Sequence, residues 1–124
     1  MIYLKDLITE IKFTKPNFEF EWEEAMRYPD IFPDKSTWFN AVKNGKVMNV
    51  SCDMNINNTD MCDYEGVDLH PGKVKGVEKQ ITSTKVELPI IMKHNGEYEL
   101  IGGNTRLVAL HKKGLPTNAW VFEI

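Results

Sequence analysis

Five neighbouring residues near the C-terminal end have the types and spacing that can hold a phosphate: Gly102, Gly103, Asn104, Thr105 and Arg106. They lie between a predicted strand at residues 97–101 and a helical pattern at residues 104–113. The first amides of a helix have no partner inside the helix, and the helix dipole adds partial positive charge there. Glycine lets a phosphate approach the backbone, and threonine and arginine side chains add donors. The pattern indicates a candidate phosphate site, although a tight turn with a solvated arginine has the same sequence.

The elements that must position this turn follow from the C-terminal pattern. Strands are expected at residues 46–52, 86–93, 97–101 and 117–124. Pro89 indicates an edge or a bulge in its strand, and Asn95-Gly96 is the strongest short signal for a hairpin. Asn104 can cap the helix that follows the turn, and Gly114 can end it.

The N-terminal part has the pattern of three helices. Residues 1–12 carry one apolar helical face, and residues 19–28 have an acidic first turn that suits a helix start. Asp34 or Ser36 can cap a third helix, which we expect to end at Gly45 in a left-handed conformation.

These elements predict an α+β fold, with a small mixed β-sheet built from the last three strands and helices packed on it. The length of 124 residues fits a single domain over residues 1–124. Within it we distinguish an N-terminal helical part (1–52), a polar loop (53–80) and a C-terminal core (81–124).

Composition and charge narrow the function classes. A hydrophobic fraction of 42% and a charged fraction of 27% are typical of a globular protein and exclude a disordered or fibrous chain. The net charge of -3 argues against a cationic nucleic-acid coat. The charge is uneven, however, because residues 1–69 are predominantly acidic and residues 70–124 carry more basic than acidic side chains. An anionic ligand therefore fits the second half better than the first.

Other side chains with chemical potential lie in the polar loop. Its carboxylates and imidazole are of the kinds that bind a divalent metal or act as a base. Their spacing does not match a calcium loop, so a solvated acidic loop is the simpler interpretation and no metal site is predicted. These residues are Asp60, Asp63, Glu65, Asp68 and His70, and two further histidines, His94 and His111, stand alone.

The two cysteines, Cys52 and Cys62, are too few for a disulfide framework. We expect both to be reduced, in a cytoplasmic protein, and to take no part in ligand binding. A zinc site with His70 would lack the usual two-residue spacing. No apolar run approaches the roughly 20 residues of a membrane helix, and the charges in residues 1–8 do not fit a signal peptide.

The stretch from Leu88 to Ile124 resembles the core of the ParB/sulfiredoxin-like superfamily. The run 98–101 leads into a glycine-arginine box, Gly103 to Arg106, and Gly114-Leu115 matches the exit to a last strand. In that superfamily the box glycine, the polar residues after it and the arginine bind nucleotide phosphates. The resemblance therefore implies a nucleotide site at this turn, with ATP or CTP and Mg²⁺ as candidate ligands. Compact members that stand alone resemble those of bacteriophages, which would place the protein in the host cytoplasm.

The departures from the superfamily pattern are informative. Asn104 stands where the sulfiredoxin branch has its catalytic cysteine, so reduction of a cysteine sulfinate is disfavoured. Asn104 and Thr105 replace the glutamate and first arginine of the ParB box. No helix-turn-helix follows the core, which disfavours a role in centromere binding.

Three functions remain open. The first is a nucleotide-binding protein that catalyses phosphoryl transfer or nucleotide hydrolysis. The second is a ParB-like nuclease or DNA-binding protein. The third is a phage-encoded interaction or inhibitor protein that binds through Trp22 and Trp38, for which a packed core is the simpler interpretation. The DNA contacts of the second function would come from Lys73, Lys75, Lys79, Lys85, Lys93, Lys112 and Lys113.

Overall fold

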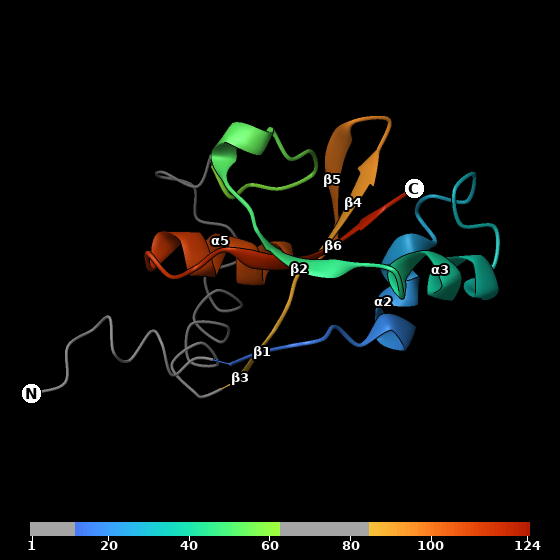
Figure 1. The fold of residues 1–124 in the computed structure, drawn as a ribbon, viewed down its shortest axis with the longest axis horizontal. Helices are drawn as coiled ribbons and strands as arrows, with labels where there is room; N and C mark the ends of the chain where they lie inside the picture. Colours follow the sequence, from blue (N-terminus) through green and yellow to red (C-terminus); the bar gives the residue numbers. More distant parts are fainter. Residues whose placement is uncertain (1–11, 63–84) are drawn as a thin grey trace, which may run out of the picture.

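The computed structural model describes residues 12–62 and 85–124 of the chain (Figure 1). In chain order the elements are β1 (Lys12–Thr14), α2 (Phe18–Ala25), α3 (Lys35–Val42), β2 (Lys46–Asn49), the 3-10 helix η1 (Cys52–Met54), β3 (Lys85–Glu87), β4 (Ile90–His94), β5 (Glu97–Gly102), α5 (Asn104–Lys112) and β6 (Asn118–Glu123). The fold is α+β, as the sequence predicts.

The main sheet has four strands in the order β2-β6-β4-β5. Strand β6 pairs in parallel with β4, whereas the other two pairs are antiparallel, so the sheet is mixed as predicted. Strands β1 and β3 form a separate parallel pair. The predicted strand 86–93 is thus divided into β3 and β4 on either side of Pro89, because proline has no amide hydrogen for a ladder.

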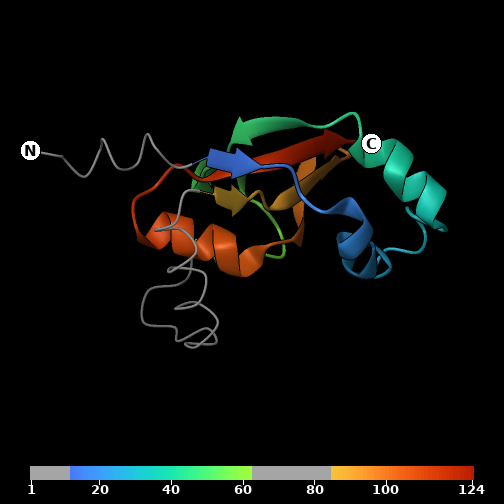
Figure 2. The same ribbon diagram turned by 90° about the horizontal axis from the view of Figure 1, so that it is seen from below.

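Alternate residues of the central strands face two separate cores. Ile90 and Met92 of β4 belong to a buried cluster with Trp38 of α3, whereas Ile91 belongs to a second cluster with Leu107 of α5. Successive strand side chains point to opposite faces, so one short apolar strand can serve both cores. Figure 2 shows α5 running along the sheet and α3 beyond its end.

The helices α2 and α3 begin at capping side chains. The Asn17 side chain accepts from the Phe20 amide at 3.1 Å, and Asp34 accepts from the Thr37 amide at 2.7 Å, which confirms the predicted Asp34 cap. Helix α2 ends at Ala25 rather than at residue 28. Trp38 is fully buried and Trp22 is partly buried against the same core. Burial of Trp38 confirms that a packed core, rather than a binding face, explains this tryptophan.

The backbone angles of three turns test the turn conformations that the sequence predicts. Asn95 and Gly96 have φ values of 52° and 80°, and Gly114 has a φ of 68°, so the hairpin and the left-handed helix stop are confirmed. The prediction for Gly45 is wrong, because its φ is not positive. Gly45 is required for another reason: a β-carbon there would overlap the indole of Trp120.

The first predicted helix lies almost entirely outside the described residues, and Lys12, at its end, belongs to β1 instead. Of the predicted polar loop, residues 63–80 also lie outside the described part. None of the helices in residues 12–62 and 85–124 is long and apolar enough to span a membrane.

Candidate functional site

An open pocket of about 800 Å³ lies where the start of α5 meets α2, the end of β5 and the loop that follows η1. All five residues of the predicted phosphate turn line it. The structure adds residues from two segments that are distant in sequence: Phe20, Glu21, Glu24 and Arg27 from α2 and its C-terminal end, and Asn58, Thr59 and Asp60 from the loop. The tertiary fold therefore places the turn in a concave site.

The start of α5 has no side-chain cap. Gly103 is the N-cap residue, with a φ of 91°, and it makes no side-chain cap bond to the first-turn amides. A β-carbon on Gly103 would lie 2.8 Å from the Pro89 Cα, so both the left-handed φ and the close approach require glycine. The prediction that Asn104 caps the helix is wrong, because Asn104 is already the first helical residue.

Asn104 instead fastens the loop to the helix. Its Oδ1 accepts from the Thr59 hydroxyl at 2.8 Å and from the Asp60 amide at 3.1 Å. Its Nδ2 donates to the Asp60 carboxylate at 3.1 Å. The side chain is thereby turned away from its own helix amides, and it fixes one wall of the pocket.

Arg106 lies between two carboxylates rather than in solvent. Its Nη2 is 3.6 Å from Glu21 Oε1, and its Nη1 is 3.9 Å from Glu87 Oε2. Only 18% of the side chain is exposed, and its buried Nε has no hydrogen-bond partner among the described residues. The alternative of a solvated first-turn arginine is therefore wrong. The guanidinium is held at the pocket by acidic partners.

Glu21 is the residue that sequence reasoning missed. Among the described residues it is the one charged residue that is buried, at 5% exposure. Burial raises the pKa of its carboxyl, and the Arg106 guanidinium offsets only part of that rise. A β-carbon on Gly102 would overlap the Glu21 carboxylate, so this glycine makes room for Glu21. The available signal was its spacing of four residues from Ala25, on the buried face of α2.

The charges that line the pocket are mixed. Three carboxylates, Glu21, Glu24 and Asp60, face two arginines, and Arg27 pairs with Glu24 at 3.1 Å. Within the described parts of the chain, no group of three or more His, Cys, Asp or Glu side chains could hold a metal ion.

Among the remaining predicted residues that the structure describes, Asp60 is the one that lines this pocket. Asp63, Glu65, Asp68 and His70 lie outside the described residues, as do Lys73, Lys75 and Lys79. His94 is at the end of β4 and His111 is in the last turn of α5, and neither lines the pocket. Lys85, Lys93, Lys112 and Lys113 are distributed over β3, β4 and the end of α5.

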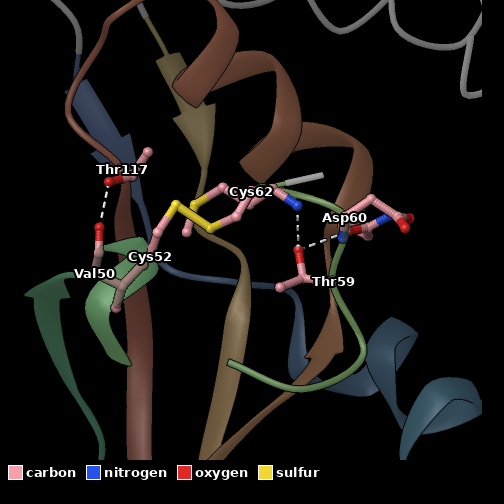
Figure 3. Close-up of a disulfide and its surroundings, with 8 residues drawn as sticks. Val50, Cys52, Thr59, Asp60, Cys62 and Thr117 are labelled. Atoms are coloured by element: carbon pink, nitrogen blue, oxygen red, sulfur yellow. Dashed lines mark hydrogen bonds between the residues drawn. A yellow bond between two sulfur atoms is a disulfide. The ribbon is translucent and has the colours of Figure 1, made fainter. Parts of the chain in front are cut away.

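Cys52 and Cys62 form a disulfide, so the expectation of two reduced thiols is wrong for this structure (Figure 3). The two positions are 10 residues apart, and their Cα atoms are 5.8 Å apart. The expectation overlooked that a single pair can close a loop without being part of a framework. A disulfide has no thiolate for a metal, which removes the zinc alternative with His70 in this state.

Comparisons with protein-family models, with characterised proteins and with solved structures found no match to this chain.

Proposed function

We propose that this chain is a cytoplasmic nucleotide-binding protein that holds a phosphate group at the start of α5. The observation that carries the proposal is the uncapped helix start. Of the three α-helices that the structure describes, α2 and α3 have side-chain caps, whereas α5 has none and opens into the pocket. Free amides at a helix start that faces a pocket favour an anion. The resemblance to the ParB/sulfiredoxin-like superfamily supports the same ligand.

Arg106 and Glu21 explain how an anion can enter a pocket that contains carboxylates. The raised pKa of Glu21 means that this carboxyl gains a proton more readily than an exposed one. A phosphate that reaches Arg106 competes with Glu21 for the guanidinium, and protonation of Glu21 removes the repulsion between the two anions. ATP or CTP, with Mg²⁺ bound to its phosphates, are the ligands to test first.

Phe20 favours a nucleotide over a bare phosphate. Its ring lines the pocket and is 67% exposed, although aromatic side chains usually avoid such exposure. Stacking of a nucleobase on an aromatic ring is worth about 1–3 kcal/mol. A base on Phe20 and a phosphate at α5 would both lie within this pocket.

The same arrangement suits phosphoryl transfer or nucleotide hydrolysis. Such reactions depend on positioning and on neutralising charge, which amides, Arg106 and a nucleotide-bound Mg²⁺ can supply.

Titration calorimetry with MgATP, MgCTP and pyrophosphate tests the proposal. Arg106→Ala should weaken binding of every phosphate ligand by about ten- to a hundredfold, because a charge-assisted contact is lost. Arg106→Lys should restore only part, since an ammonium cannot make the bidentate contact. Lys93→Ala is the matched control, because Lys93 is a cation that packs over the Tyr98 ring and does not line the pocket.

Loss of folding must be separated from loss of binding. Arg106→Ala leaves the buried Glu21 without its cation, so the double variant Glu21→Gln/Arg106→Ala serves as a charge-balanced background. Equal affinity in the wild type and in both variants would mean that phosphate does not bind at this turn.

A further inference from the structure

The loop between Cys52 and Cys62 forms one wall of the pocket. Three of its residues, Asn58, Thr59 and Asp60, line the site, and two of them are the partners of Asn104. The position of this loop therefore decides both the shape of the pocket and the orientation of the first residue of α5.

The loop is joined to the sheet in its middle and at its N-terminal end. Asn57 donates its amide to the Tyr98 carbonyl at 2.8 Å and accepts from the Leu100 amide at 2.9 Å, which extends the outer edge of β5. Before the loop, the Val50 amide donates to the Thr117 carbonyl at 2.8 Å. At its C-terminal end, the last described residues are the buried Met61 and then Cys62, whose bond to Cys52 closes the loop. Figure 3 shows the disulfide beside Thr59 and Asp60 of the wall.

Both cysteines are exposed, so a small reductant can reach the bond without unfolding the core. We propose that Cys52–Cys62 is a thiol–disulfide exchange site, acted on by dithiols, whose oxidation state sets the order of the pocket wall and through it the affinity for the nucleotide. The affinity part rests on the proposed function, whereas the exchange site and the ordering of the wall do not.

The exchange is a two-electron reaction. A thiolate of the reductant attacks one sulfur, the Cys52–Cys62 bond breaks, and a mixed disulfide forms with release of one cysteine thiolate, which takes up a proton. The second thiolate of the reductant attacks the mixed disulfide and releases the other cysteine. The reductant ends as a cyclic disulfide, and the chain ends with two thiols. In a reducing cytoplasm the resting chain is the dithiol, and an oxidising disulfide closes the wall by the reverse steps.

The effect on the wall follows from loop closure. Cross-linking residues at this separation favours the ordered loop by a factor on the order of a hundred. After reduction the loop is held by the Asn57 bridge, by the Asn104 contacts, by the bond from the Asn58 side chain to the Leu100 carbonyl and by the buried Met61. The affinity for the nucleotide should fall by less than the preference for the ordered loop does, on the order of tenfold. The reason is that the α5 amides and Arg106 do not belong to the loop.

Three samples test the proposal: the oxidised chain, the chain reduced with dithiothreitol, and the variant Cys52→Ser/Cys62→Ser. Thiol titration of the folded chain should find two thiols after reduction. Hydrogen exchange should become faster in residues 53–61 of the reduced chain and of the variant, while β6 stays unchanged as the internal control. MgATP should bind the oxidised chain more tightly than the other two, and dithiothreitol should have no effect on the variant.

Each result decides a separate point. Thiols that appear only after denaturation, or equal exchange in the oxidised and reduced chains, overturn the proposed exchange site. Faster exchange with an unchanged affinity for MgATP overturns its control of the pocket. If the wall responds but no sample binds MgATP, MgCTP or pyrophosphate, the proposed function fails and the exchange site stands. Should the serine variant not fold, the reduced wild type still decides, because its sequence is unaltered.

Discussion

The starts of α3 and α5 differ in what surrounds their first backbone amides, which have no partner inside the helix. At α3, Asp34 accepts from both the amide and the hydroxyl of Thr37, at 2.7 Å and 2.8 Å, and the site is exposed. At α5, Gly103 offers no side chain, and the one nearby amide side chain, Asn104, is bonded to a distant loop. The Asp34 side chain therefore caps the first turn of α3, whereas the N-cap residue of α5 provides no side-chain cap.

The difference separates a helix start that is capped locally from one whose surroundings come from distant parts of the chain. A cap such as Asp34 serves stability alone and needs no other part of the chain. The start of α5 instead depends on three segments: α2 supplies Glu21, the residue before β4 supplies the close contact with Gly103, and the loop supplies Asp60. Variants at these positions should therefore distinguish the two helix starts.

The largest effect is expected from Gly103→Ala. The new β-carbon would lie 2.8 Å from the Pro89 Cα and 2.9 Å from Arg106 Nη2, in a backbone with a φ of 91°. Left-handed strain and overpacking together should lower the free energy of unfolding by roughly 2–5 kcal/mol, measured by urea denaturation. Gly96→Ala is the matched control, because its φ is also positive but no atom lies within 4 Å. Equal losses for the two variants would show that the contact with Pro89 does not matter.

A middle-sized effect is expected from Asn104→Ala. Three hydrogen bonds to Thr59 and Asp60 are lost, one of them to a carboxylate, which should cost about 1–3 kcal/mol of stability. The pocket wall moves with them, so affinity for MgATP should also fall. Asp34→Ala removes a true cap at α3 and should lower the melting temperature while leaving that affinity unchanged. If Asn104→Ala lowers stability but leaves the affinity for MgATP unchanged, as expected for Asp34→Ala, the two helix starts do not differ in the way proposed.

The smallest effect is expected from Glu21→Gln, and it should depend on pH. Because folding raises the pKa of Glu21 above 4.5, the folded state binds this proton more tightly than the unfolded state does. The resulting stability is present below the unfolded pKa and is lost as the pH rises through the folded pKa. Glu21→Gln should thus match the wild type in acid and become relatively more stable toward neutral pH. Urea denaturation of both proteins at several pH values between about 4 and 8 measures the difference in their free energies of unfolding. A difference that does not change with pH would contradict the prediction.

The fold was predictable where the signal is local. Asp34, Asn95-Gly96 and Gly114 act within four residues of their own position, so their roles follow from the neighbouring sequence. The candidate site was predictable only as a turn. Asn104 was mistaken for a cap because its real partners, Thr59 and Asp60, are more than 40 residues away. The pairing of Glu21 with Arg106 likewise depends on how α2 packs, which no short pattern encodes.

The bridge at Asn57 also bears on how the chain avoids joining other copies of itself. A strand at the border of a sheet presents unpaired amides and carbonyls, which invite a strand from another molecule. β5 is such a border strand, and Asn57 occupies the Tyr98 carbonyl and the Leu100 amide on its outward side. The loop between Cys52 and Cys62, which shapes the pocket, therefore also blocks pairing of β5 with a strand of another molecule.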